Sequence, residues 1–221
     1  MAAVTTLRAQ KKILRKAITT VLKPLPVSAI EEQSQAVAAR VLALPSFDKC
    51  RSVSCYLSMP TGEIDTTSLV SEILRRDKSF FVPKIETTEG HMQFLKLYGK
   101  EDLDTLPSGT WGIKEPGPQW NGSPRVNVLD RDCEELDMIL LPGVAFDYSL
   151  SRLGHGKGYY DRFIASYVAS GRPRPLLATL VALALREQVL EGQGVPIGDT
   201  DWKMDFIVTP DAVLSNAESN Q

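Results

Sequence analysis

The segment with the most chemical potential runs from Arg152 to Asp161, reads RLGHGKGYYD and places two cations among three glycines. Glycines at positions 154, 156 and 158 let backbone N–H groups approach an anion, while Arg152 and Lys157 supply positive charge. The spacing matches neither the GxxxxGK[ST] P-loop nor the GxGxxG dinucleotide fingerprint. We interpret the segment as a phosphate-binding loop of another kind. The alternative is a glycine-rich turn with solvated charges.

Four further charged residues could complete such a site. Lys11 and Arg15 lie four residues apart on one face of a predicted helix and could bind a single phosphate chain, with a solvated basic face as the alternative. Asp161 could hold Mg²⁺, which proteins bind through one or two carboxylates together with substrate phosphates, and Asp201 is the candidate second carboxylate. The alternative role of Asp161 is to cap the helix that follows it.

Strands and helices alternate around these residues. Met138-Ile139-Leu140-Leu141 has the length and apolarity of a buried strand, and Phe163, Ile164, Tyr167 and Val168 recur at helical spacing after the loop. Further helices are predicted at residues 5–23, 28–44, 67–76 and 186–190, and further strands at 53–57, 80–85, 91–98, 176–184 and 206–209. This order predicts a single α/β domain over residues 1–221, with three α/β/α layers and a mostly parallel, doubly wound sheet.

Two helices carry more detailed expectations. The first should bury a stripe formed by Leu7, Leu14, Ile18 and Val21. The second should begin with an S-x-x-E capping box made by Ser28 and Glu31.

Residues 99–131 lose this periodicity and are predicted to form a long ordered loop. The loop contains Trp111 and Trp120, which could stack on a flat ligand. A tryptophan that plugs the loop onto the core is an equally good interpretation.

The composition excludes several classes of protein. A hydrophobic content of 43% is ample for a core, and a net charge of -2 argues against a general nucleic-acid binder. The three cysteines, Cys50, Cys55 and Cys133, have no metal-type spacing and indicate a reducing compartment. His91 and His155 are the only histidines, so a zinc site is not expected, and no apolar run has the roughly 20 residues of a transmembrane helix.

Several spaced motifs resemble the 5-formyltetrahydrofolate cyclo-ligase family. They are Lys11-x-x-x-Arg15, YLSMPTGEIDT, WGIKEP, LPGVAFDYSLSRLGHGKGYYD and DTDWKMDFIVT, and they cover nearly the whole chain. The resemblance implies a Rossmann-like fold and conversion of 5-formyltetrahydrofolate to 5,10-methenyltetrahydrofolate. That reaction would depend on ATP and Mg²⁺, pass through an imidate phosphate and release ADP and phosphate.

The resemblance also implies roles for individual residues. ATP would be bound by Lys11, Lys12, Arg15, Arg152, Gly154, His155, Gly156, Lys157, Gly158, Tyr159 and Tyr160. The folate would be bound by Arg15, Leu57, Glu63, Trp111, His155, Gly156, Lys157, Gly158 and Tyr159. Catalysis would rest on Lys157, Arg152 and Tyr159, and the metal would be held by Asp161 and Asp201.

One position departs from the family pattern. Leu150 stands where the family has glycine, two residues before Arg152. If the turn needs a positive φ at this position, Leu150 is strained or the turn differs.

The sequence leaves two other functions open. One is a relative that binds nucleotide or folate without turnover, and the other is a sugar-phosphate isomerase on a similar scaffold. The basic N-terminal segment resembles a transit peptide, but its cleavage would remove Lys11. We therefore expect a cytoplasmic monomer whose partners are small molecules, not nucleic acid or membrane.

Overall fold

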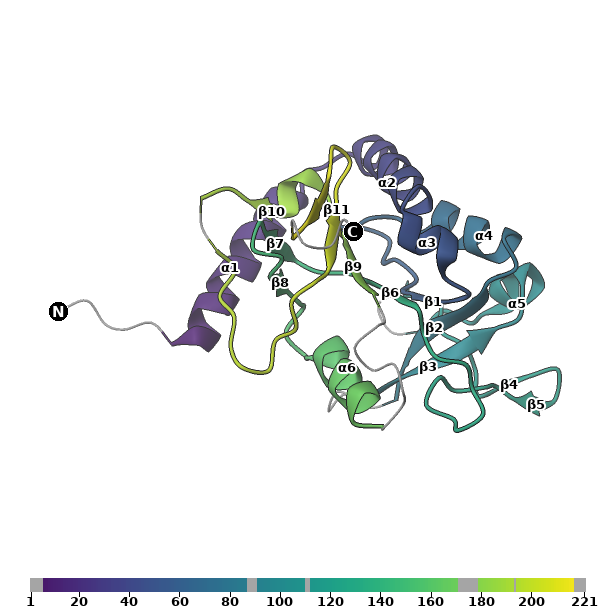
Figure 1. Ribbon diagram of the computed structural model, residues 1–221. Coiled ribbons are helices and arrows are strands. Elements are labelled where there is room, and N and C mark those ends of the chain that lie inside the picture. The colour runs from purple at the N-terminus through teal and green to yellow at the C-terminus, as the bar shows by residue number, and fades with distance from the viewer. Residues whose placement is uncertain (1–5, 87–90, 110–111, 171–178, 193, 217–221) are drawn as a thin grey trace.

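The computed structural model describes residues 6–86, 91–109, 112–170, 179–192 and 194–216 of the 221-residue chain (Figure 1). Its centre is a seven-stranded sheet with the order β12-β11-β9-β6-β1-β2-β3. The strands are β1 (Ser52–Cys55), β2 (Ser79–Ile85), β3 (Met92–Leu97), β6 (Met138–Leu141), β9 (Thr179–Leu183), β11 (Phe206–Val208) and β12 (Val213–Ser215). Only the two edge strands, β3 and β12, run antiparallel to their neighbours. The predicted mostly parallel sheet is confirmed.

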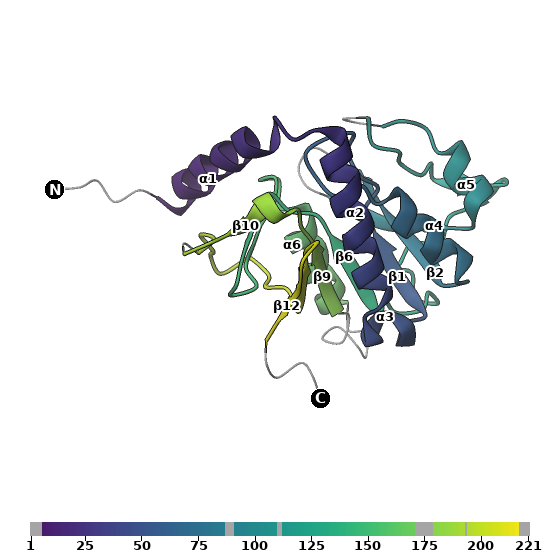
Figure 2. The same ribbon diagram turned by 90° about the horizontal axis from the view of Figure 1, so that it is seen from above.

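Helices cover both faces of this sheet (Figures 1 and 2). α2 (Val27–Leu42), α3 (Pro45–Lys49) and α4 (Thr67–Arg75) lie on one face, and α6 (Tyr159–Ala169) lies on the other. β6 shows why, because Met138 and Leu140 join the core under the first group while Ile139 and Leu141 join the core under α6. A strand buried on both faces is a continuous apolar run, as the sequence of β6 is.

α1 (Leu7–Leu22) lies beside these layers and packs against a smaller three-stranded sheet (Figure 2). That sheet has the order β10-β7-β8, with β7 at Ala145–Asp147, β8 at Arg152–Leu153 and β10 at Val189–Leu190. The sequence predicted only a loop between β6 and Arg152, since strands of two or three residues are too short to show a period.

Three helix details differ from expectation. α1 buries Ile18 and Leu22, while Leu7 and Val21 are 39% and 48% exposed. α2 begins directly after Pro26, whose extended backbone makes it the N-cap, so Ser28 lies inside the helix and the predicted capping box is wrong. The helix predicted at 186–190 is a short 3₁₀ turn, η2 (Arg186–Gln188), followed by β10.

The predicted long loop contains regular structure. It includes α5 (Lys100–Thr105) and a small hairpin of β4 (Gln119–Trp120) and β5 (Ser123–Pro124). A buried ion pair holds the segment: the Arg125 guanidinium donates to both oxygens of Asp102 and also, at 3.0 Å each, to the carbonyls of Lys96 and Gly117. Trp120 packs on this guanidinium, with the Arg125 Cζ 5.6 Å from the centroid of the Trp120 ring, which is a contact within the loop. Trp111 lies outside the described residues.

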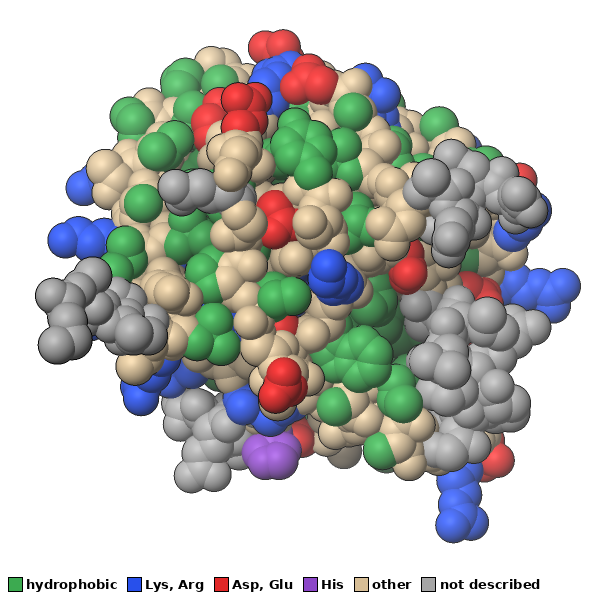
Figure 3. All heavy atoms as spheres, turned by 60° about the vertical axis from the view of Figure 1, so that its left-hand side comes forward, with side chains coloured by type: hydrophobic (Ala, Val, Ile, Leu, Met, Phe, Trp, Pro, Cys, Tyr) green, Lys and Arg blue, Asp and Glu red, His purple; other side chains and the backbone are tan. Residues whose placement is uncertain are grey.

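Over the described residues, no helix combines the length and the apolarity needed to cross a membrane. On the face shown in Figure 3, lysine and arginine side chains are scattered among acidic and apolar ones and form no continuous basic patch.

Candidate functional site

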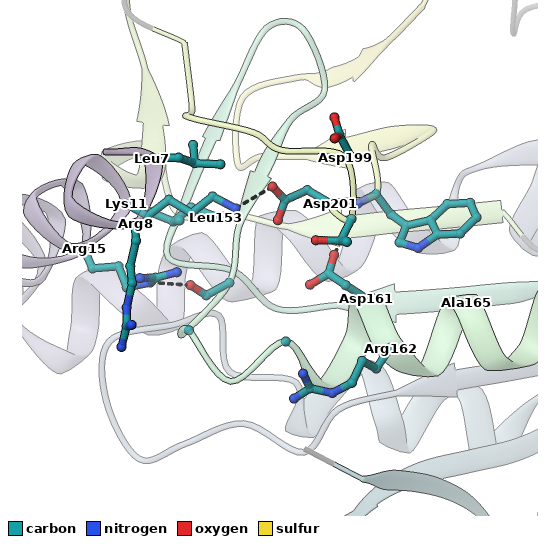
Figure 4. Close-up of a pocket in the computed structure, with 15 residues that line it drawn as sticks. Leu7, Arg8, Lys11, Arg15, Leu153, Asp161, Arg162, Ala165, Asp199 and Asp201 are labelled. Atoms are coloured by element: carbon teal, nitrogen blue, oxygen red, sulfur yellow. Dashed lines mark hydrogen bonds and ion pairs between the residues drawn. The ribbon is translucent and has the colours of Figure 1, made fainter. Parts of the chain in front are cut away.

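A polar cleft of about 950 Å³ opens between α1, the glycine-rich loop, the start of α6 and residues 199–202 (Figure 4). The residues that line it are Leu7, Arg8, Lys11, Arg15, Leu153, Gly154, Gly156, Gly158, Asp161, Arg162, Ala165, Asp199, Thr200, Asp201 and Trp202. The cleft therefore joins the N-terminal helix to the glycine-rich loop and to the segment before β11.

Lys11 and Arg15 both point into this cleft from α1. Lys11 forms an ion pair with Asp201, and Arg15 donates from Nε to the Gly154 carbonyl at 2.8 Å. Burial lowers the pKa of Arg15 from its ordinary value, and the nearby Asp201 opposes that shift. The structure thus brings these two cations to one cleft, and their binding of a phosphate chain stays a prediction.

The glycines of the loop are required by its backbone. Gly156 has a φ of +104°, and a Cβ there would lie 3.3 Å from the Arg15 guanidinium carbon. Gly158 has a φ of +67° and is the N-cap of α6. Because side chains are excluded here, backbone N–H groups and the positive end of α6 can face an anion in the cleft.

A second cavity, of about 480 Å³, lies on the other side of this loop. Its lining residues are Tyr56, Leu57, Met59, Glu63, Pro83, Ile85, Met92, Ile113, Glu115, Pro142, Arg152, Gly154, His155, Lys157, Gly158, Tyr159, Tyr160 and Asp161. These residues include the segments that follow β1 and β6, so the cavity lies at the carboxyl edge of the parallel sheet, where α/β folds place their ligands. Gly154, Gly158 and Asp161 line both the cleft and the cavity.

Glu63 brings a buried carboxyl group to this mostly apolar cavity. It is 5% exposed and accepts a hydrogen bond from the Met59 N–H at 2.6 Å. Burial raises its pKa to about 7, so Glu63 is half protonated near neutral pH. Tyr56 and Tyr160 line the same cavity, and burial raises the pKa of each phenol well above its ordinary value.

Arg152 lines the second cavity and not the polar cleft, with 5% of its surface exposed. Its Nη2 donates to both oxygens of Asp161, at 3.1 and 3.0 Å, and its Nη1 donates to the Pro142 carbonyl at 3.2 Å. Its Nε is buried and has no hydrogen-bond partner among the described residues. A fixed guanidinium that lines the second cavity suits an oxyanion ligand.

Leu150 does adopt the backbone conformation that a glycine would provide. Its φ is +62° and its side chain is 1% exposed. The turn before Arg152 is therefore retained in this chain, at the cost of a strained leucine that apolar packing holds in place.

Asp161 and Asp201, the predicted metal ligands, both line the polar cleft (Figure 4). Asp161 pairs with Arg152 and also accepts from the backbone N–H of Trp202 at 3.3 Å, next to Asp201 in the chain. No group of three or more His, Cys, Asp or Glu side chains that could hold a metal is found within the described part of the chain. Two carboxylates fit Mg²⁺, which takes its other ligands from phosphates and water.

The remaining predicted residues do not line the polar cleft. His155, Lys157, Tyr159 and Tyr160 line the second cavity with Leu57 and not the polar cleft. Lys12 is exposed on α1 and lines neither. Burial lowers the pKa of His155, and the Arg152 and Arg15 guanidiniums add to that shift, so its imidazole is neutral near pH 7.

Sequence reasoning missed several lining residues. Arg8 and Arg162 add positive charge to the polar cleft, and Trp202 adds an aromatic wall. Arg8 could have been found, because it lies three residues before Lys11 on the same helix. Glu115 and Tyr56 line the second cavity, but only the sheet topology brings their segments together.

Comparisons with known proteins agree on one family. Residues 7–210 match the model of the 5-formyltetrahydrofolate cyclo-ligase family. A probable 5-formyltetrahydrofolate cyclo-ligase from Schizosaccharomyces pombe is 35% identical, over 94% of this chain and 98% of the relative. A relative from Arabidopsis thaliana, named mitochondrial, is 34% identical over 93% of this chain and 76% of its own length.

Solved structures give the same result. The NMR structure of Aquifex aeolicus 5,10-methenyltetrahydrofolate synthetase superposes with a TM-score of 0.71 at 30% identity, covering 96% of this chain and 95% of the other. The synthetase from Mycoplasma pneumoniae has a TM-score of 0.63 at 18% identity, covering 90% of this chain and 98% of the other, and shows the shared fold.

Proposed function

Because the chain belongs to the 5-formyltetrahydrofolate cyclo-ligase family, we propose that it converts 5-formyltetrahydrofolate to 5,10-methenyltetrahydrofolate with ATP and Mg²⁺, releasing ADP and phosphate. One observation carries the proposal: the glycine-rich loop lies between the polar cleft and the mostly apolar second cavity and lines both. ATP would occupy the cleft and the folate the cavity, with their reactive groups meeting at the loop.

The reaction needs two bond exchanges. The formamide oxygen attacks the γ-phosphorus of ATP, the bond from that phosphorus to the bridging oxygen breaks, and ADP leaves. The N10 amine then attacks the activated formyl carbon and loses its proton. The original formyl oxygen departs with the phosphate as the ring closes. No protein nucleophile is required, so catalysis consists of alignment and neutralisation of phosphate charge.

The residues of the polar cleft supply that neutralisation. Lys11, Arg15 and Arg8 would bind phosphate oxygens from α1. Asp161 and Asp201 would hold Mg²⁺, which supplies Lewis-acid charge to the phosphates. In the protein alone these aspartates pair with Arg152 and Lys11. Binding of the nucleotide and its metal would let the cations turn to phosphate and the carboxylates to Mg²⁺, so no buried charge is left unpaired.

Arg152 and Lys157 would act where the phosphoryl group crosses to the folate. Before the nucleotide binds, Asp161 and Pro142 hold Arg152 beside the second cavity, so its charge is already in place. Lys157 is exposed between two glycines and reaches the second cavity. Tyr159 lines the same cavity at the start of α6.

The second cavity suits a flat ring system with polar edges. Leu57, Met59 and Ile113 provide apolar walls, and Glu63 presents its buried carboxyl group to ring N–H donors. A ligand without such a donor would leave this buried carboxyl group without a hydrogen-bond partner from the ligand. The cavity should therefore bind it much less tightly than a ligand that has one.

The test is direct. Purified protein given 5-formyltetrahydrofolate, ATP and Mg²⁺ should form the methenyl chromophore, and omission of either ATP or the metal should stop it. Absence of product under the complete conditions contradicts the proposal. Calorimetric binding of ATP or folate without product would support a non-catalytic relative instead. The cytoplasmic location and the monomeric state stay predictions.

A further inference from the structure

The turn from Asp147 to Ser151 lines neither the cleft nor the cavity, yet it is organised by a buried carboxylate. Asp147 ends β7 and is 5% exposed. Its Oδ1 accepts from the backbone N–H groups of Ser149 and Ser151, at 2.9 and 3.0 Å, and its Oδ2 accepts from that of Val195 at 2.7 Å. Three charge-assisted bonds to backbone make this a strongly fixed side chain.

Two of these bonds close the turn that leads to Arg152. Within the turn, the Leu150 N–H also donates to the Asp147 carbonyl at 3.0 Å. Leu150 is held with a positive φ of 62°, which costs a leucine about 1–2 kcal/mol. The carboxylate of Asp147 therefore stabilises a backbone path that the side chain of Leu150 opposes.

The third bond reaches a different segment, residues 195–204. Val195 is held at its start by Asp147, and Met204 is held at its end, because the Met204 N–H donates to the Leu150 carbonyl at 2.9 Å. Lys203 also donates from Nζ to the Ser149 carbonyl at 3.1 Å. The middle of this segment, residues 199–202, forms one wall of the polar cleft. One turn thus holds both ends of that wall.

We propose that Asp147 is a positioning residue for nucleotide binding. It fixes the wall that carries Asp201 at a set distance from the loop of Arg152 to Gly158. The effect is selective, because residues 195–204 contribute to the polar cleft and none of them lines the second cavity. The inference rests on the proposed assignment of ATP to the polar cleft.

The Asp147→Asn variant tests this role with almost no change in size. Its amide places an N–H₂ group against a backbone N–H donor, so at least one of the three bonds is lost. We expect the Kd for Mg-ATP, measured by calorimetry, and the KM for ATP to rise roughly tenfold or more. The KM for 5-formyltetrahydrofolate should change by less than about twofold.

Asp137→Asn is the matched control. The Oδ2 of Asp137 also accepts two backbone N–H groups, from Arg51 at 2.7 Å and Ser52 at 3.1 Å, but it lines neither space. This variant should lower the melting temperature and leave the Kd for Mg-ATP unchanged. The inference is overturned if Asp147→Asn lowers the melting temperature in the same way and still binds Mg-ATP with wild-type affinity.

A further variant covers the case in which Asp147→Asn does not fold. Asp147→Glu keeps the charge and displaces the acceptor by one methylene, and it should show the same selective loss of nucleotide affinity. Unchanged nucleotide affinity in Asp147→Glu would then overturn the inference. If the wild-type protein neither binds ATP nor turns over folate, the proposed function fails. An active wild type with an unaffected Asp147 variant contradicts only the positioning role.

Discussion

At the scale of single residues, charge decides the site. Lys11 of the cleft is paired with Asp201, and Arg152 of the second cavity is paired with Asp161. Lys157 differs, since it is exposed and lies between glycines, free of packing restraints. It can therefore approach a transferring phosphoryl group without first breaking a buried ion pair.

Replacement of Lys157 by alanine should lower kcat by roughly 10²–10³-fold, the usual effect of removing one group that stabilises developing charge. The melting temperature should stay unchanged, because the side chain is exposed. Lys16→Ala is the control, since Lys16 is exposed on α1 and lines neither space. Wild-type turnover in Lys157→Ala would remove this residue from the proposed mechanism.

Glu63 should make stability depend on pH. Burial raises its pKa from 4.5 to about 7, so the folded protein binds this proton more tightly than the unfolded chain does. The free energy of unfolding should therefore fall as pH rises between these two values, by roughly 3 kcal/mol in all from this group.

Urea unfolding of wild type and Glu63→Gln at about pH 5 and about pH 8 measures this contribution. The loss of stability at the higher pH should shrink in the variant. Exposed Glu191→Gln should keep the wild-type dependence. If Glu63→Gln keeps it too, the ionisation of Glu63 is not coupled to folding.

At the scale of elements, the glycine-rich loop is restricted by its neighbours as well as by its own backbone. Gly156 combines a positive φ with close contact to Arg15, so α1 and the loop can approach only if no side chain stands between them. With a side chain at this position, the loop could not approach α1 closely enough for both to contact the same anion.

Gly156→Ala should strain the backbone by about 1–2 kcal/mol and push against Arg15. We expect the KM for ATP to rise by roughly tenfold, since the new methyl group moves a nucleotide-binding cation. Gly117→Ala is the control, because a Cβ there meets nothing within 4 Å. Equal kinetics in the two variants would show that the loop tolerates a side chain.

At the scale of the whole molecule, buried polar contacts hold irregular segments onto the sheet. The pair Arg125–Asp102 joins α5 to the segment after β5, and Ile113 and Glu115, which lie between them in the chain, line the second cavity. The side chains of Arg125 and Asp102 are 3% and 1% exposed, so removal of either one would leave the other charge buried without its partner.

Arg125→Met should lower the free energy of unfolding by about 3–5 kcal/mol, because it leaves Asp102 buried and unpaired. Urea unfolding measures the loss, and the double variant Arg125→Met/Asp102→Leu should recover much of it. Arg186→Ala is the control, because it breaks an exposed ion pair with Asp211 and should leave the midpoint of urea unfolding almost unchanged. A similarly small effect for Arg125→Met would mean that solvent reaches Asp102.

The sequence predicted what depends on local pattern. Apolar runs such as β6 and helical spacing such as that of α6 identified most of the sheet and its layers, because each element shows its buried face in its own residues. The elements β7, β8 and α5 were missed, because each is too short to repeat its period more than once or twice.

The chemical content of the site was likewise determined by the sequence, since the glycines, cations and carboxylates come in motifs that can be read in order. Tertiary structure decided which of these residues line the polar cleft and which line the second cavity. Lys157 and His155 line the second cavity while Lys11 and Asp201 line the cleft, although the first three were predicted to bind one nucleotide and Asp201 its metal. The physical reason is that distance between residues far apart in the chain is set by packing. The turn at Asp147 and Leu150 is a clear case, because its bonds join segments about 50 residues apart that no local pattern relates.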